Sequence, residues 1–383
     1  MTIDAAEFVA LRHQLHAEPE LAYHEFKTSA LVAELLEGWG YEVATGIGGT
    51  GVVATLRQGP GGRTIGIRAD MDALPITEAP GLPYASRTPG VMHACGHDGH
   101  TSILLAAARE IATTRDFSGT VRLIFQPAEE NGGGARRMIE DGLFERFPVD
   151  AVFGLHNWPG VPAGEFRFID GPAMASVDMI VITIAGKGGH GARPHETVDP
   201  IVAAASLIMA LQTIVSRNTD PLEAAVVTVG AIEGGNVPNV IPDSVELKLT
   251  VRAFSPAVRE NLKARIKALA EAHAQSFGAV ARVQAPRGYP VLVNHAAEND
   301  FARNVARRHF GEPGTLRPIT ASEDFAFMLE HRPGAYLFVG NGPSADLHSP
   351  HYNFNDEILP IAARYWVELV QDYLSANEEA RAA

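Results

Sequence analysis

The sequence predicts a two-domain α/β protein in which a small domain is inserted into a larger one. Its 383 residues are enough for about two domains. Strands and helices alternate on both sides of a middle segment, whose own order is strand, helix, strand, strand, helix and strand. That order is typical of the split βαβ, ferredoxin-like arrangement. We therefore expect one domain from residues 1–177 and 291–383, and an inserted domain at residues 178–290.

The N-terminal part is expected to begin with two helices that are followed by strands. Apolar residues recur at helical spacing in residues 5–18 and again in residues 31–36. Residues 51–58 and 63–69 favour strands, because a Gly-Pro-Gly-Gly turn separates two apolar runs. The elements expected after these are a helix that ends near residue 115 and strands at 119–126, 150–155 and 335–339.

The inserted segment has its own set of expected elements. They are strands at 178–185, 223–232, 244–254 and 279–287, and helices at 200–216 and 256–277. The helix at 200–216 carries more apolar surface than a sheet of this size should cover. We therefore expect a homodimer that forms through this domain.

Composition and charge exclude several classes of partner. Hydrophobic residues make up 46% of the chain and charged residues 20%, as in ordinary globular proteins. The net charge of −14 argues against nucleic acid or an anionic membrane. The single cysteine excludes an internal disulfide and favours a cytoplasmic location. We expect no signal peptide and no membrane span, since the longest apolar run, Ile201–Leu211, is shorter than roughly 20 residues.

The stretch Met92-His93-Ala94-Cys95-Gly96-His97-Asp98-Gly99-His100 holds three imidazoles, one thiol and one carboxylate, and an apolar helix follows it. Asp98 would cap that helix, but a cap does not require a thiol two residues from an imidazole. Cys95 and His97 suit a divalent metal ion, and the glycines let the backbone bend around it. The alternative is that Cys95 is an inert small hydrophobic residue.

Three of the expected strands end on side chains that can bind a metal ion. Asp70 and Asp72 follow one strand, Glu129 and Glu130 follow another, and His156 ends a third. Ligand sites in α/β sheets lie beyond the carboxyl ends of strands. One such residue would be an ordinary polar turn, but three strand ends together with the cysteine cluster predict a metal site.

Two later loops carry further candidates. His190 lies among glycines after the first strand of the inserted segment, where it is either an electrophile or a solvated turn histidine. The glycines around Lys187 do not match a phosphate-binding loop. Near the C-terminus, His348 and His351 each offer a last imidazole to a metal centre, and spacing alone does not decide between them.

Together these motifs resemble the aminoacylase/carboxypeptidase-like metallopeptidase family. Within it they resemble the amidohydrolase branch of hippurate hydrolases, N-acyl-amino-acid deacetylases and indole-acetyl-amino-acid hydrolases. The resemblance runs from about Leu11 to Val370, and it implies a mixed-sheet, zinc-exopeptidase-like catalytic domain with an inserted lid and dimerisation domain. The motifs are His93-Ala94-Cys95-Gly96-His97-Asp98-Gly99-His100, Pro127-Ala128-Glu129-Glu130, Gly154-Leu155-His156, Gly188-Gly189-His190, Ser322-Glu323-Asp324-Phe325 and Leu347-His348-Ser349-Pro350.

The resemblance also implies roles for individual residues. Glu129 is similar to the general base, and Asp72 to an aspartate that orients a metal ligand. His190 is implied to donate to the oxyanion in a partner subunit's site. Arg252 matches a cation for the substrate's carboxylate, with an ordinary surface arginine as the less favoured alternative, and Asn236 is implied to face the substrate. The implied metal ligands are Cys95, His97, Glu130, His156 and His348. The usual His-x-Asp pair reads Asp-x-Asp here.

Five donors exceed the needs of one tetrahedral site, which favours two divalent ions per subunit, drawn from Zn²⁺, Mn²⁺, Co²⁺ or Ni²⁺. Such a centre suits hydrolysis of the amide bond of an N-acyl amino acid. A dipeptidase or carboxypeptidase of the same family is the alternative. Two other interpretations are a thiol hydrolase, with Cys95 as nucleophile and His97 as base, and a binding protein without activity. The first leaves the glutamate pair unexplained, and the presence of every donor argues against the second.

Overall fold

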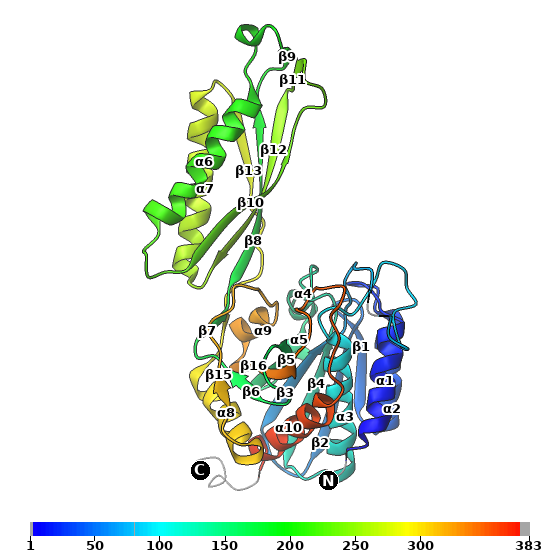
Figure 1. Ribbon diagram of the computed structural model, residues 1–383. Helices are drawn as coiled ribbons and strands as arrows, with labels where there is room; N and C mark the ends of the chain where they lie inside the picture. The colour runs from blue at the N-terminus through cyan, green and yellow to red at the C-terminus, as the bar shows by residue number, and fades with distance from the viewer. Residues whose placement is uncertain (1–2, 80, 376–383) are drawn as a thin grey trace. The chain divides into compact units, whose positions relative to one another are not determined.

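The computed structural model describes residues 3–79 and 81–375, and the chain divides into two compact units (Figure 1). Unit 1 comprises the residues up to Gly171, Val293–Arg317 and those from Asp324 onward. Unit 2 comprises Pro172–Leu292 and the short return segment Pro318–Glu323. The predicted bounds of 178–290 fall inside unit 2. The sequence pattern did not indicate the return segment, because it contains no strand or helix of the inserted motif.

Unit 1 is built on a mixed eight-stranded sheet, which confirms the predicted α/β class. The strand order is β1-β2-β4-β3-β5-β16-β6-β15. The central strands β4, β3, β5 and β16 are parallel, whereas β1, β2 and β4 pair antiparallel. The strands span β1 Glu42–Ile47, β2 Gly51–Gln58, β3 Thr64–Asp70, β4 Gly119–Gln126, β5 Ala151–Pro159, β6 Phe166–Phe168, β15 Gly314–Thr315 and β16 Gly334–Gly342.

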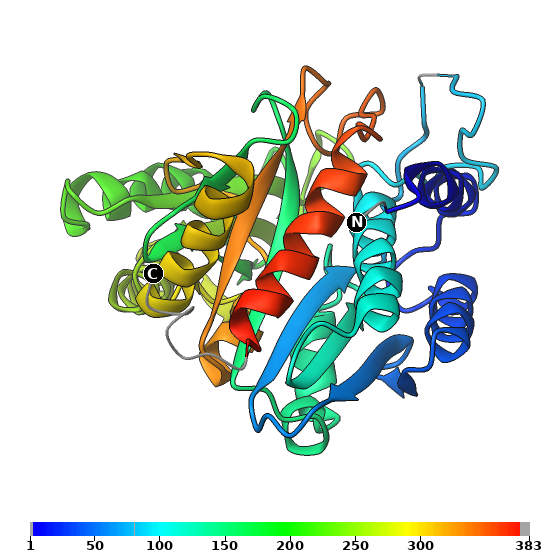
Figure 2. The same cartoon turned by 90° about the horizontal axis from the view of Figure 1, so that it is seen from below.

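Helices pack against several strands of this sheet. Two of them, α3 (His97–Thr114) and α10 (Ile358–Tyr373), lie side by side against it (Figures 1 and 2). Both are apolar on most of their surface, because they pack between the sheet and other helices. The other helices of the described part of unit 1 are α1 Ala5–Ala17, α2 Phe26–Gly38, α4 Gly134–Glu140, α5 Leu143–Arg146, α8 Ala296–Phe310 and α9 Ala326–His331.

The parallel centre brings the candidate groups to one edge of the sheet. Asp70 is the last residue of β3, and Glu129 and Glu130 follow β4. His156 lies within β5, which continues three residues beyond it, and His348 follows β16. Since parallel strands point the same way, these side chains converge from segments far apart in the sequence.

Unit 2 has the strand order β10-β12-β8-β13, with two helices on one face of the sheet (Figure 1). The chain order β8, α6, β10, β12, α7, β13 makes it a split βαβ, ferredoxin-like arrangement. Its main elements are β8 Ser176–Ala185, α6 Pro200–Asn218, β10 Ala225–Glu233, β12 Ser244–Ala253, α7 Pro256–Ser276 and β13 Val280–Gln284. Short strands occur at β7 Pro172–Met174, β9 Gly189–His190, β11 Val240–Ile241 and β14 Leu292–Val293, and a 3₁₀ turn at Pro194–Glu196.

Helix α6 matches the predicted helix at 200–216 and ends two residues later, at Asn218. Its most apolar part has a mean hydropathy of 1.5. By length and composition alone it is one helix that could cross a membrane. However, Ala203, Leu207 and Leu211 are fully buried against the sheet of unit 2, which is the pattern of a core helix.

Candidate active site

The cysteine cluster turns sharply into helix α3. Gly96 has a φ of +91°, and a Cβ at this position would lie 2.3 Å from Asn157 Nδ2 and 2.6 Å from the Tyr352 hydroxyl. Only glycine accommodates both constraints. The turn places the Cys95 Sγ 3.4 Å from His156 Nε2, although 61 residues separate them in the chain.

The glutamate that follows β4 lies beside two imidazoles. Glu130 Oε1 is 3.2 Å from His348 Nε2 and 3.9 Å from His97 Nε2. His348 has a φ of +63°, and its N–H donates to the Ala94 carbonyl, which ties its loop to the cysteine segment.

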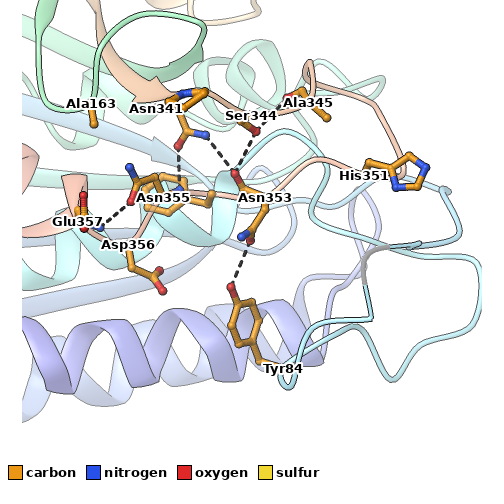
Figure 3. Close-up of a pocket in the computed structure, with 12 residues that line it drawn as sticks. Tyr84, Ala163, Asn341, Ser344, Ala345, His351, Asn353, Asn355, Asp356 and Glu357 are labelled. Carbon is orange, nitrogen blue, oxygen red and sulfur yellow. Dashed lines mark hydrogen bonds between the residues drawn. The ribbon is translucent and has the colours of Figure 1, made fainter.

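His351 occupies a different place. It lines a cavity of about 580 Å³ together with residues such as Tyr84 and Asn353 (Figure 3). His348, by contrast, shares a donor group with Cys95 and Glu130. The structure therefore favours His348 over His351, the choice that spacing left open.

Two groups of potential ligands share the cysteine. Cys95, His97 and His156 form one group, and Cys95, Glu130 and His348 form the other. Within each group the donor atoms lie within 4.8 Å of one another. Each group could hold a divalent ion, and Cys95 would be available to both.

The buried atoms of this cluster fit a metal ion better than they fit a hydrogen-bond network. Among the described residues, His97 Nε2 and Glu130 Oε1 are buried and have no hydrogen-bond partner. Burial disfavours a charged His97, yet the carboxylates of Asp70, Asp72 and Glu130 outweigh it and raise the His97 pKa to about 10. The cluster thus carries an excess of negative charge that a divalent cation would balance.

The cysteine is not arranged as a free nucleophile. Burial, followed by Glu130, Glu129 and Asp70, raises the pKa of the Cys95 thiol well above its ordinary value. Burial and the neighbouring His100 hold the pKa of His156 well below its ordinary value. The hydrogen-bond partner of the thiol is His156 rather than His97. A thiol hydrolase needs a depressed thiol pKa, so these directions weigh against that alternative.

Asp72 fixes the backbone of the glutamate pair. Its carboxylate accepts the N–H of Glu129 at 3.0 Å and of Glu130 at 3.1 Å. Its Oδ1 also lies 3.3 Å from His97 Nδ1. Both amides are thereby held in place, and a carboxylate oxygen of each glutamate lies within 4.8 Å of a His97 nitrogen and of the other glutamate's oxygen. The N–H of Asp324 donates to Glu129 Oε1 at 3.3 Å.

A second set of buried residues supports the first, and two of its members, Arg68 and Asn157, were not found from the sequence. Arg68 donates to Asp70 at 2.6 Å, and Asp70 in turn accepts from His100 Nδ1 at 2.6 Å. The Asn157 backbone N–H donates to the other ring nitrogen of His100. Burial opposes ionisation of Asp70, but Arg68, His97 and His100 outweigh it and hold its pKa well below the usual range. His100 is therefore engaged at both nitrogens and is not needed as a ligand.

Asp98 corrects one sequence-based expectation. It does not cap α3, because Gly96 occupies the N-cap position and makes no side-chain cap. Instead Asp98 Oδ2 lies 3.0 Å from Arg12 Nη1 and 2.9 Å from His16 Nδ1. Although burial opposes ionisation, these partners hold the Asp98 pKa well below its usual value. The partner residues lie more than 80 positions away, so no local pattern signals the contact.

The other three candidates belong to unit 2. His190 is exposed on β9, and its Nδ1 accepts the N–H of Ala192 at 3.1 Å. Asn236 is exposed in the loop after β10. Arg252, on β12, donates to the Thr320 carbonyl at 3.1 Å, and burial lowers its pKa. Arg252 is thus hydrogen-bonded to the return segment Pro318–Glu323, whereas an ordinary surface arginine points freely into solvent.

Comparisons with known proteins give the class to which this fold and this donor set belong. The sequence profile of peptidase family M20/M25/M40 matches residues 66–372. A hippurate hydrolase of Campylobacter jejuni is 46% identical over 96% of this chain and 97% of its own. An N-acetyl-L-cysteine deacetylase of Bacillus subtilis is 43% identical over 98% of this chain and 90% of its own.

A solved structure supports the same family assignment. A Bacillus subtilis protein described as a dinuclear metal-binding peptidase of the M20 family superposes with a TM-score of 0.84. It is 35% identical, with 97% of this chain and 99% of that chain covered. Fold and site together thus define a hydrolase of the amidohydrolase kind. The chain belongs to peptidase family M20/M25/M40.

Proposed function

We propose that this protein is a metal-dependent amidohydrolase that cleaves N-acyl amino acids, of the hippurate or N-acetyl kind, into a carboxylic acid and a free amino acid. The observation that carries the proposal is the pair of donor groups that share Cys95, next to a glutamate pair whose amides Asp72 fixes. Relatives with hydrolase and deacetylase names match over nearly the whole chain and support the substrate class.

In this proposal the donors hold two divalent ions per subunit. The ligands are Cys95, His97, Glu130, His156 and His348. Thiolate and imidazole donors suit Zn²⁺, Co²⁺ or Ni²⁺, and the carboxylate also admits Mn²⁺. The bound ions would supply Lewis acidity, which acidifies water and polarises the amide carbonyl.

The protein's own residues perform the proton transfers. The buried carboxylate of Glu129 takes a proton from the attacking water and delivers it to the leaving nitrogen. Such general acid–base catalysis contributes about 10²–10⁴-fold. Asp72 keeps the Glu129 backbone and the His97 ring in place through the contacts described above.

In this proposal unit 2 acts as a lid, and three of its residues contact the substrate or the oxyanion. His190 donates to the oxyanion in a partner subunit's site, Arg252 binds the substrate's carboxylate, and Asn236 faces the substrate. A carboxylate-binding arginine would separate N-acyl amino acids from simple amides, because a charge-assisted contact discriminates strongly.

Chelation tests the reaction class directly. Dialysis against a strong chelator is expected to reduce hydrolysis of N-acyl amino acids to background, and added Mn²⁺, Zn²⁺, Co²⁺ or Ni²⁺ to restore it. A panel of N-acetyl, N-benzoyl and longer acyl amino acids, assayed beside dipeptides, identifies the substrate. Full activity after chelation would instead support a thiol hydrolase. Faster cleavage of dipeptides than of every N-acyl amino acid would favour the exopeptidase alternative.

We also propose that the protein forms a homodimer through unit 2. Strand β10 is an edge strand, so its outer backbone groups have no strand partner in the sheet of unit 2. The neighbouring helix α6 exposes Ile201, Val202 and Met209, the last at 72% of its surface. Apolar side chains beside an open edge strand suit a second copy of the same surface.

Sedimentation tests the dimer. The wild-type protein is expected to sediment as a dimer at micromolar concentration, and Met209→Glu to weaken association by at least about 10-fold through a buried unpaired charge. Val280→Glu, on the opposite edge strand β13 and also exposed, is the matched control and should leave association unchanged. A wild-type monomer at that concentration would refute this part of the proposal.

A further inference from the structure

Glu25 has a fully buried carboxylate that contacts a distant segment of the chain. It stands at the N-cap position of helix α2, where a side chain often caps the helix, but it makes no cap hydrogen bond. Its carboxylate instead accepts the Thr50 hydroxyl at 2.5 Å and the backbone N–H of Ala128 at 2.9 Å. The contact with Ala128 spans 103 positions of sequence.

Within residues 3–79 and 81–375, the Glu25 carboxylate has no cationic partner. Among the described residues, no arginine, lysine or histidine forms an ion pair with Glu25. A buried carboxylate without a cationic partner is costly, and burial raises the Glu25 pKa. Since the side chain does not cap α2, its two acceptor contacts are what distinguish it, and one of them leads to the segment that follows β4.

Ala128, the residue that Glu25 holds, is in a conformation that alanine disfavours. Its φ is +54°, in the left-handed region, and it immediately precedes Glu129 and Glu130. The turn closes on itself, because the Ala128 carbonyl accepts the N–H groups of Gly132 and Gly134. Such strain persists only where surrounding contacts fix it.

Two buried carboxylates therefore bind three consecutive backbone N–H groups. Glu25 takes the N–H of Ala128, and Asp72 takes those of Glu129 and Glu130. The segment that carries Glu25 also contacts this turn and the residue that follows Asp72. Tyr23 donates to the Gly132 carbonyl at 2.7 Å, and the Ala73 N–H donates to the Glu20 carbonyl at 2.8 Å.

We propose that Glu25 is a positioning residue for the glutamate pair. By fixing Ala128 in its left-handed conformation, its carboxylate sets the directions in which the Glu129 and Glu130 side chains leave the backbone. This inference rests on the roles proposed above for those two residues. It adds to them a residue of the N-terminal segment that belongs to none of the donor groups described above.

The test compares two substitutions of one residue. Glu25→Ala removes the acceptor of the Ala128 N–H, and kcat is expected to fall by about 10²-fold with little change in KM, because a small displacement of a catalytic group is costly. Glu25→Gln keeps an oxygen that can accept the same N–H and should retain most of the activity. Bound metal in Glu25→Ala is expected to fall as well, since Glu130 moves with the turn.

A matched control separates positioning from general destabilisation. Tyr41→Phe removes another buried hydrogen bond of unit 1, from the Tyr41 hydroxyl to the Ala108 carbonyl at 2.8 Å, and should leave kcat unchanged. A partial rescue gives the sharpest evidence. Ala128→Gly in the Glu25→Ala background should recover at least about threefold in kcat, because glycine enters the left-handed region freely. If Glu25→Ala lowered kcat only by disturbing the packing of unit 1, Ala128→Gly would not restore it.

Hydrogen exchange tests the inference even if the reaction is another one. The peptide that covers residues 126–134 should lose amide protection in Glu25→Ala, and keep it in Glu25→Gln and Tyr41→Phe. Unchanged protection in Glu25→Ala, or equal losses of kcat in Glu25→Ala and Tyr41→Phe, would overturn the role of Glu25. A wild-type protein that hydrolyses no N-acyl amino acid would overturn the proposed function, while the exchange result would still decide about Glu25.

Discussion

Glu129→Gln is expected to keep its metal and to lose turnover by roughly 10²-fold or more. The amide retains the shape of the side chain, and Asp72 still holds the backbone N–H of residue 129. What disappears is the basicity that removes a proton from water. Metal analysis of the purified variant, together with kcat for the best N-acyl amino acid, measures both effects.

Glu130→Gln is the matched control, since it makes the same chemical change at the next residue. Glu130 Oε1 faces His97 and His348, so loss of its charge should weaken at least one metal site measurably. The opposite pattern, in which Glu129→Gln loses metal and Glu130→Gln keeps it, would reverse the two assignments.

Asp178→Asn is expected to destabilise unit 2 by about 3–5 kcal/mol, because it leaves a largely buried arginine without its partner. Arg259 donates to the two Asp178 carboxylate oxygens at 2.6 Å and 2.7 Å, which links α7 to β8. Gly288, after β13, donates its N–H to the same carboxylate at 3.1 Å. Calorimetry of the thermal transition measures the loss.

The pH dependence of this effect has a definite sign. Burial opposes ionisation of Asp178, but its hydrogen bonds with Arg259 and Gly288 outweigh burial and lower its pKa. The ion pair therefore stabilises the folded state at pH values above about 4, the pKa of Asp178 in the unfolded chain. This stabilisation is lost as the pH falls through the lower pKa that Asp178 has in the folded state. The difference between wild type and Asp178→Asn should narrow below about pH 4.

A surface pair provides the comparison for this prediction. Glu271→Gln breaks the exposed contact between Lys267 and Glu271 on α7, and should change stability by about 0.5 kcal/mol or less. Equal effects of the two substitutions, or a difference that stays constant down to pH 3, would contradict the account of Asp178.

Much of the fold was predictable because its signals are local. The apolar spacing of α6 and α7, and the glycine turn between β2 and β3, each lie within a few residues of the element they predict. The short strands β6, β7, β9, β11, β14 and β15 have two or three residues each, too few for a pattern. Strand β1 was also missed, although it has six residues, since Glu42–Ile47 is exposed along much of its length.

The residues of the candidate site also divide into those with a local sequence signal and those without one. Cys95 and His97 form a compact motif, and strand ends indicate Glu129 and His156. Glu25, Arg68 and the pair formed by Asn157 and Tyr352 were missed, because their partners lie far away in the chain. The hydrogen bond from the Tyr352 hydroxyl to Asn157 joins residues 195 positions apart. A single polar residue in an apolar stretch gives no sign of such a partner.

The discontinuity of unit 1 bears on how the protein matures during synthesis. Strand β16 lies between β5 and β6 in the sheet, yet the ribosome makes it only after the whole of unit 2, whose last segment ends at Glu323. Until Gly334–Gly342 emerges, the nascent sheet has an open edge at β5, which invites pairing with other chains. The segment with His348 appears later still. A complete set of the proposed ligands therefore exists only once nine-tenths of the chain has been translated. With the proposed ligands, metal binding would complete folding and would not start it.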